Sequence, residues 1–371
     1  MQAVVALAAW LAMYFGLLDI GGMSPLLWHG HEMVFGFGLA AVGGFLLTAV
    51  PNWTGAASLS GRPVAILAAL WLAGRVAFWL VGILPGWLVT VVELSFLPVL
   101  AGMLAGPLIA AGKVRNIVFL PILALFLAAD ALVGLELLGV AGTGMAGVYA
   151  GIYILLLMIA IVGGRIIPAF TATALRMRRI EAAPQSHGWL EIAAPASVVI
   201  VGAADLTVPG SAAFGWLALA GCLVHAVRLA GWQTRHVLGQ PILWILHAGY
   251  AWLIVGLALR GMSAFTDAVP PSAALHAFTA GTIGSMVLGV MTRAALGHSG
   301  RPLQLATATV AAYVLVQAGA VLRVFLPIVA PSLLADVMPL LSGLLWAGGF
   351  AVFVAVYLPI VTRPRIDGRP G

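Results

Sequence analysis

The sequence is poor in charge. Only 8% of its 371 residues are charged, while 63% are hydrophobic. Soluble domains contain about 25% charged and about 45–50% apolar residues, so this composition excludes a water-soluble fold. A helix needs about 20 mainly apolar residues to cross a membrane. The chain therefore has room for about twelve spans joined by short connections, and for almost no domain outside the bilayer.

Cysteine and lysine each occur once, as Cys222 and Lys113. A single cysteine excludes an internal disulfide, and the lack of a C-x-x-C-H segment excludes a covalently attached c-type haem. Any haem must then be held by histidine or methionine. The formal charge of +6 does not indicate a nucleic-acid partner, because no basic run is interleaved with aromatic residues. We interpret the basic balance as a signal of membrane topology.

The apolar stretches predict an all-α polytopic membrane protein of about twelve transmembrane helices, from residues 2–18 to 333–360. Basic residues such as Lys113 and Arg115 follow the even-numbered spans. By the positive-inside rule, both termini then lie in the cytoplasm. We predict one integral membrane domain over 1–371, compatible with a six-plus-six division but without a strong internal repeat. Its parts are the first six spans (1–170), a cytoplasmic connection (171–186) and the last six spans (187–360).

Tryptophan occurs twelve times, mostly at the predicted span ends. Trp28, Trp87, Trp189 and Trp232 are examples. Because amphipathic rings favour the membrane–water boundary, this distribution predicts an aromatic belt rather than a site.

Ionisable side chains inside the predicted spans are the candidate functional residues. Each of them is unfavourable in a membrane by at least about 2.5–3.5 kcal/mol, so each needs a reason to be there. The predicted spans place most of them in the outer half of the membrane. This outer group consists of His29, His31, Glu32, Arg75, Glu93, Asp130, Glu136 and His276. Within it, Glu32, Glu93 and Asp130 are candidates for delivering protons from outside.

His29 and His31 are separated by one glycine. On an ideal helix their side chains point about 200° apart. One metal ion can use both only if His29 lies in a non-helical start of the span, a geometry that Gly30 permits. Alternatively, each histidine serves a different centre, or His29 bonds to lipid headgroups or water.

A second, looser group lies toward the cytoplasmic side. His247 is the deepest member, and the small residues after it allow either a flat macrocycle or a neighbouring helix to approach. His225 and His298 are candidate ligands or, alternatively, interfacial residues. Arg165 and Arg293 end predicted spans, where a guanidinium either pairs with a haem propionate or marks the membrane boundary.

One segment resembles a known family. Residues 28–37, Trp-His-Gly-His-Glu-Met-Val-Phe-Gly-Phe, continuing through 44–55, closely resemble the opening block of the NnrS family. Further similar segments follow in the same order, at 164–168, 247–250, 274–277, 291–294 and 297–301. The resemblance implies a bacterial inner-membrane protein that contains haem and copper and is linked to denitrification and to nitric oxide tolerance. The histidines in the similar segments are His29, His31, His247, His276 and His298.

Our leading hypothesis is a membrane protein with haem b and copper that binds or turns over nitric oxide or iron-nitrosyl species. Imidazole suits both metals. The metal candidates are His29, His31, His247 and His276, followed by His298 and His225, while Arg165 and Arg293 complete the cofactor-binding set. The expected partners are the lipid bilayer, nitric oxide and an electron donor that the sequence does not identify. Whether the protein is a haem–copper oxidoreductase is left open.

Two alternatives belong to other functional classes. Twelve spans with embedded charges also suit a secondary transporter, in which Arg75, Glu93 and Asp130 would be substrate or proton sites. Against it, transporter sites lie near the midplane, whereas these charges lie mostly outward. The third hypothesis is a metal-binding or nitric oxide-sensing membrane protein without turnover.

Overall fold

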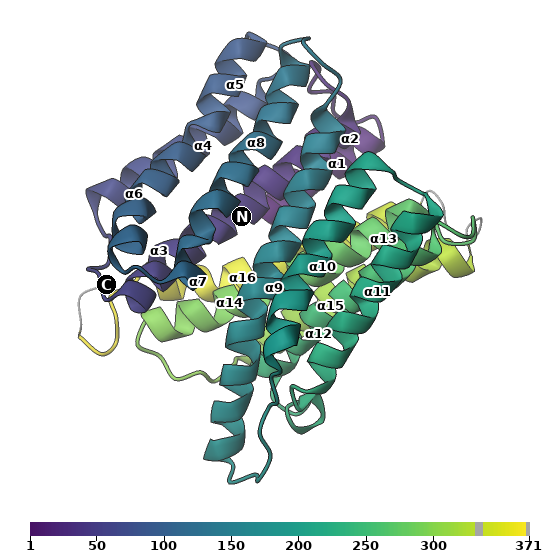
Figure 1. Cartoon of the computed structure of the whole chain (residues 1–371). Helices are drawn as coiled ribbons and strands as arrows, with labels where there is room; N and C mark the ends of the chain where they lie inside the picture. Colours follow the sequence, from purple (N-terminus) through teal and green to yellow (C-terminus); the bar gives the residue numbers. More distant parts are fainter. Residues whose placement is uncertain (331–336, 369–371) are drawn as a thin grey trace. The chain divides into compact units, whose positions relative to one another are not determined.

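The computed structural model describes residues 1–330 and 337–368, and throughout these residues the regular structure is helical (Figure 1). Eleven helical segments of this part are long and apolar enough to cross a membrane. The all-α multi-pass prediction is confirmed. The predicted first span appears as a shorter apolar helix of 13 residues. The predicted start of the last span, at 333–336, lies outside the described residues, and the orientation of the termini stays a prediction.

The chain forms two compact units, a first unit over Gln2–Ile154 and a second unit from Leu155 onward. In the first unit, α4, α5, α6 and α8 run beside one another (Figure 1). The helices of this unit are α1 Gln2–Tyr14, α2 Pro25–His31, η1 Glu32–Gly38, α3 Leu39–Thr54, α4 Arg62–Trp79, α5 Gly86–Leu94, α6 Phe96–Ala110, α7 Val114–Ile117 and α8 Phe119–Leu137.

The long helix α9 (Gly144–Met177) contributes residues to both units. The remaining helices of the second unit are α10 Gly188–Thr207, α11 Ala212–Ala230, η2 Thr234–His236, α12 Pro241–Met262, α13 Pro271–His276, η3 Ala277–Ile283, α14 Gly284–His298, α15 Thr307–Val329 and α16 Val337–Val361. Of the three short η segments, η1 and η3 are π-helices and η2 is a 3-10 helix.

Both π-helices directly follow a histidine. In the first unit α2 ends at His31 and η1 begins, and in the second unit α13 ends at His276 and η3 begins. The wider turn leaves backbone carbonyls that need other donors. An indole supplies one in each unit: Trp71 Nε1 donates to the carbonyl of Gly36 at 2.9 Å, and Trp346 Nε1 donates to that of Ala280 at 3.1 Å. π-helical turns of this kind occur frequently at functional sites.

The surroundings of the two π-helices are also alike. In the first unit α1 packs on α2 and η1, while α4 packs on η1 and α6 on α3. In the second unit α12 packs on α13 and η3, while α15 packs on η3 and α16 on α14. In each unit, three further helices therefore pack around the span that contains the π-helix. The sequence itself shows no strong repeat.

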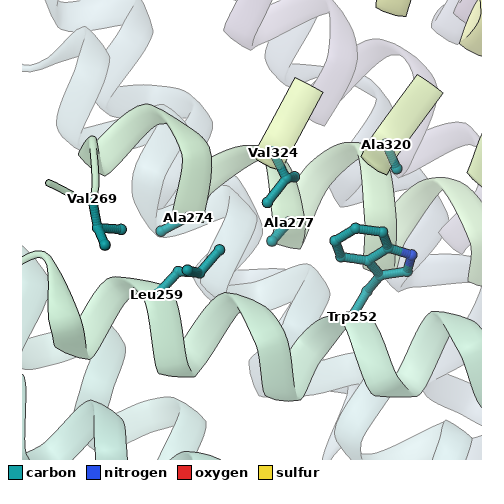
Figure 2. Close-up of a cluster of buried hydrophobic side chains, with 7 residues drawn as sticks. All are labelled: Trp252, Leu259, Val269, Ala274, Ala277, Ala320 and Val324. Carbon is teal, nitrogen blue, oxygen red and sulfur yellow. The ribbon is translucent and has the colours of Figure 1, made fainter. Parts of the chain in front are cut away.

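Small side chains bring the helices of the second unit together. Figure 2 shows Trp252 and Leu259 projecting from α12 toward the alanines of α13 and η3. Helix association in lipid depends on close packing rather than on a hydrophobic driving force, so alanine at the contact is favourable. The complete cluster is Trp252, Leu259, Val269, Ala274, Ala277, Ala320 and Val324.

The tryptophans correct one prediction. Trp87 and Trp189 are exposed, as expected of an aromatic belt, but Trp28 and Trp232 are fully buried. Trp28 Nε1 donates to the carbonyl of Phe78 at 3.3 Å. These two indoles therefore pack inside their units. A position near the end of a span does not reveal whether the side chain faces lipid or the interior.

Candidate metal centre in the first unit

His31 lies at the end of α2, where the π-helix begins, and its side chain is fully buried. The imidazole stacks on the ring of Phe78, with centroids 3.5 Å apart and 12° between the planes. Its Nε2 lies 3.0 Å from Oδ1 of Asp130. One face and one nitrogen of the ring are thus held by α4 and α8, which fixes its orientation.

Three carboxylates surround this imidazole. Besides Asp130 on α8, Glu93 of α5 places Oε1 3.6 Å from Nε2 of His31. Glu32, the first residue of η1, places Oε1 3.7 Å from Nδ1. All three carboxylates are buried. The site therefore combines acidic groups from three separate helical elements around one histidine.

Arg75 of α4 ties two of the carboxylates together by ion pairs with Glu32 and Glu93. Gln2 of α1 donates a further hydrogen bond to Glu32. Glycine makes the approach possible: a Cβ at Gly74 would lie 2.6 Å from Oε2 of Glu93. Arg75 was a candidate from the sequence, but Gln2 was not, although it is the only residue of α1 with a side-chain amide.

The cluster has more acidic than basic groups, so its charge depends on how many of them are protonated. Glu32, Glu93 and Asp130 are acidic, Arg75 is the one guanidinium paired with them, and a neutral His31 leaves two negative charges. Burying net charge is strongly unfavourable unless it is paired. Nδ1 of His31, Oε2 of Glu93 and Oδ2 of Asp130 are buried without a hydrogen-bond partner within the described residues. Either a divalent cation or added protons must supply the missing positive charge.

The donor geometry fits a metal ion. His31, Glu93 and Asp130 each offer one ligand atom, and these atoms all lie within 4.8 Å of one another. Two donors that bind one ion at about 2.0–2.2 Å lie about 3–3.5 Å apart, close to the 3.0 and 3.6 Å separations from Nε2. Because Nε2 of His31 faces two carboxylates, this nitrogen suits a metal ion held among oxygen ligands.

A small cavity lies beside the cluster. Its lining residues are His31, Phe78, Thr90, Glu93, Leu94, Asp130, Val133, Gly134 and Leu137. Most of this wall is apolar, so the cavity suits a small neutral molecule better than a hydrated ion.

Two members of the outer group lie elsewhere in the first unit. His29 packs on Trp10 of α1, with ring centroids 4.6 Å apart, so it points toward a different helix from His31. Glu136 accepts a 2.6 Å hydrogen bond from the backbone N–H of Gly144, the first residue of α9. This contact stabilises the start of a helix. Neither residue belongs to the group of three possible ligands.

His276 of the second unit has the hydrogen bonding of a preset ligand. Its Nδ1–H donates to the backbone carbonyl of Ser272 at 2.7 Å. That bond fixes the tautomer and makes Nε2 the acceptor nitrogen. Metal-binding histidines commonly use one ring N–H in this way.

The other histidine candidates have different surroundings. Nε2 of His247 lies 3.0 Å from the hydroxyl of Thr171, and Nδ1 lies 2.9 Å from that of Thr234. Nδ1 of His225 lies 2.7 Å from the hydroxyl of Tyr250. These nitrogens face hydroxyl groups rather than carboxylates, and neither histidine belongs to the group of three possible ligands found in the described part of the chain.

The remaining candidates lie on helices of the second unit, and Arg165, expected at the end of a span, lies inside α9, which continues to Met177. His298 is exposed at the end of α14. The guanidinium of Arg293 stacks over Phe170, 3.7 Å from the ring centroid, and Arg165 is half-buried in α9. The predicted roles of His298, Arg293 and Arg165 in cofactor binding stay predictions.

Together, the fold and the cluster define a multi-pass helical membrane protein with a buried ionic centre. A family model described as NnrS protein matches residues 1–365. The chain therefore belongs to the NnrS family, as residues 28–55 indicated, and this membership fits a nitric-oxide-related membrane protein. No curated protein matches the sequence.

Proposed function

We propose that this protein is a metal-containing membrane protein that binds or turns over nitric oxide or iron-nitrosyl species and so gives tolerance to nitric oxide. The observation that carries the proposal is the buried cluster around His31. With its carboxylates ionised and His31 neutral, it lacks two positive charges, and its imidazole and carboxylate donors are spaced as ligands of one ion. A divalent metal ion satisfies both conditions at once.

Copper is the metal we assign to this centre. His31, Glu93 and Asp130 would hold it, and mixed nitrogen and oxygen donors bind Cu²⁺ most tightly among the divalent first-row metals. When bound, the ion supplies a redox centre at which a small ligand can be held. The protein's own groups set the conditions there. Arg75 holds Glu93 in place and limits the negative charge, while Phe78 fixes the ring of His31.

Haem b is the second proposed cofactor, with His276 as its ligand. The hydrogen bond from Nδ1 to Ser272 leaves Nε2 directed as an acceptor, which suits a haem iron. His29 is a further candidate. Arg165 and Arg293 are proposed partners of propionates on a haem held by another of the candidate histidines, because about 25 Å of continuous helix separates His276 from Arg293.

Substrate and protons would reach the copper centre by different means. Nitric oxide is small and uncharged, so it can enter from lipid through the apolar wall of the cavity beside His31. Glu32, Glu93 and Asp130 are the groups that would hold or pass protons at that centre. We place the protein in the bacterial inner membrane, where a membrane-associated electron donor would reduce it.

Optical spectroscopy tests this proposal. Purified protein would be measured oxidised, reduced, and reduced with nitric oxide, with His187→Ala as the control because this exposed residue carries no assigned role. We expect a Soret band that shifts with nitric oxide, is lost or altered in His276→Ala, and persists in His31→Ala. A wild-type protein without haem, despite haem supplied during expression, contradicts the proposal.

The same cluster also supports a second candidate, a proton-coupled transporter. Two added protons, one of them on His31, would neutralise the excess charge as well as a divalent ion does. A protein that is purified without metal and transports a substrate with a proton would establish this alternative, in which His31, Glu93 and Asp130 carry protons.

A further inference from the structure

A second buried polar network lies in the second unit, around Tyr250 of α12. Its hydroxyl lies 2.7 Å from Nδ1 of His225 and 3.1 Å from Nη1 of Arg228, both on α11. All three residues are buried. The metal and haem assignments above do not use this network.

The directions of these hydrogen bonds follow from the chemistry of the groups. A guanidinium can only donate, so Arg228 donates to the oxygen of Tyr250. Among the described residues, Nδ1 of His225 is the one hydrogen-bond partner of this hydroxyl that can accept a proton, so we assign the phenolic O–H as its donor. The tyrosine therefore already has a base in hydrogen-bond contact with the proton that it would lose on oxidation.

Trp232 completes the surroundings of this tyrosine. Its buried indole ring lies 4.4 Å from the ring of Tyr250, centroid to centroid, and the guanidinium of Arg228 lies 5.5 Å from the indole. Arg228 is held by an ion pair with Glu191 and by a 2.7 Å hydrogen bond to the carbonyl of Ala160. The charge of the guanidinium is thus compensated close to the phenol.

The backbone of α9 makes room for this arrangement. A Cβ built at Gly164 would overlap the guanidinium of Arg228. Any larger residue at that position would displace the arginine and with it the donor to Tyr250, so the network depends on a glycine in a neighbouring helix.

Tyr313 offers a comparison within the same unit. It is as completely buried as Tyr250 and lies 5.8 Å from the ring of Trp244. Its buried hydroxyl has no hydrogen-bond partner among the described residues, and so no imidazole. The two tyrosines therefore share burial and an aromatic neighbour but differ in having a base for the phenolic proton.

We propose that Tyr250 is a redox-active residue that reacts with lipid-soluble one-electron oxidants of the nitrogen dioxide class. Nitrogen dioxide takes one electron from Tyr250 and becomes nitrite, while the phenolic O–H bond breaks and an N–H bond forms at Nδ1 of His225. The products are a neutral tyrosyl radical and an imidazolium. Tyr250 loses the electron more easily when its proton moves to His225 at the same time, because an oxidised phenol is a very strong acid.

A second nitrogen dioxide molecule makes the event permanent. It adds to the ring carbon next to the one that carries oxygen, so a C–N bond forms, and the hydrogen of that carbon moves to the phenolic oxygen. The product is 3-nitrotyrosine at position 250. Nitrogen dioxide forms when nitric oxide meets oxygen, so the proposal rests on the proposed function for its oxidant but not on haem or copper.

The test exposes purified protein in lipid nanodiscs to dilute nitrogen dioxide and maps nitration by mass spectrometry of peptides. We expect Tyr250 to be nitrated at least tenfold more than Tyr313, with a tyrosyl radical signal that is absent from Tyr250→Phe. In His225→Gln, whose amide accepts a hydrogen bond but not a proton, nitration of Tyr250 should fall about tenfold.

Two results would overturn the proposal. In one, nitration follows exposure, so that Tyr14, which is 47% exposed, is modified while Tyr250 is not. In the other, His225→Gln nitrates Tyr250 as wild type does. The comparison of Tyr250 with Tyr313 needs only wild-type protein, so it stands if a variant fails to fold. Haem and copper content would be measured on the same samples. Protein that contains both cofactors but fails the nitration test contradicts the role of Tyr250 alone, whereas protein without them contradicts the proposed function.

Discussion

The two π-helical regions have the same backbone plan and opposite chemistry. Each begins after a histidine, and each has a glycine five residues after that histidine, Gly36 in η1 and Gly281 in η3. The residue next to the histidine differs. Glu32 lies in a cluster of ion pairs, whereas Ala277 lies in the apolar cluster of Figure 2.

Two hydrogen bonds near the second π-helix join uncharged groups. Trp252 Nε1 donates to Gln317 Oε1 at 2.8 Å, and Gln317 Nε2 donates to Ser285 Oγ at 2.6 Å. This chain of neutral groups has no charge to balance, unlike the cluster around His31. The comparison teaches that one backbone arrangement can carry a buried ionic cluster in one unit and neutral packing in the other, according to the side chains that face it.

Removing the guanidinium of Arg75 from the first region should have the largest effect on stability. In Arg75→Met, the buried carboxylates Glu32 and Glu93 lose their partner, and breaking a buried ion pair in this way costs about 3–5 kcal/mol. Thermal unfolding of metal-free protein in detergent would measure the loss. Arg62→Met is the control, because Arg62 lies exposed at the start of the same helix. Equal stability of the two variants would contradict the assignment of Arg75.

Introducing a charge beside the second π-helix should have the next largest effect. Ala277→Glu places a carboxylate among apolar side chains, which is unfavourable by about 2.5–3.5 kcal/mol in a membrane. The free energy of unfolding should fall by about that amount, and Ala277→Gln, which has the same size without the charge, should lose less. If glutamate is tolerated at this position, the proposed difference between the two regions is wrong.

A single methyl group should disturb the metal centre to a smaller extent. The Cβ of Gly74→Ala would lie 2.6 Å from Glu93 Oε2, so the carboxylate must move. Displacing a group that positions a metal ligand weakens metal binding about 10–100-fold, which a copper titration would measure. Gly102→Ala, where no atom lies within 4 Å of the added Cβ, should leave the affinity unchanged.

The indole donors should give the smallest effects. Trp71→Phe and Trp346→Phe each leave a π-helical carbonyl without its side-chain donor, which costs about 1–3 kcal/mol. Because the two contacts are alike, the two losses of stability should be similar. Trp87→Phe is the control for the loss of a tryptophan, since Trp87 is 60% exposed. A loss in only one variant would show that the two regions are not equivalent.

The spans and most members of the cluster could be predicted from the sequence. His31, Glu32, Glu93 and Asp130 are conspicuous because ionisable groups are rare in lipid. Their contacts with Gln2 and Phe78 were not predictable, because a mostly apolar span shows no polar face that fixes its rotation.

The histidine environments were equally hidden in the sequence. The hydroxyls that bond to His247 come from residues 76 and 13 positions away along the chain. The two π-helices carry no turn or proline signal in the sequence, so their equivalence became visible only through the packing around them.

Metal analysis of the purified protein tests the central claim most directly. After copper loading and removal of loosely bound ions, we expect wild type to retain a stoichiometric ion that His31→Gln and Glu93→Gln lose. Glu136→Gln should retain it, because that carboxylate caps α9 instead. A wild-type protein that holds no ion, or a Glu93→Gln variant that holds as much as wild type, would contradict a metal centre at this cluster.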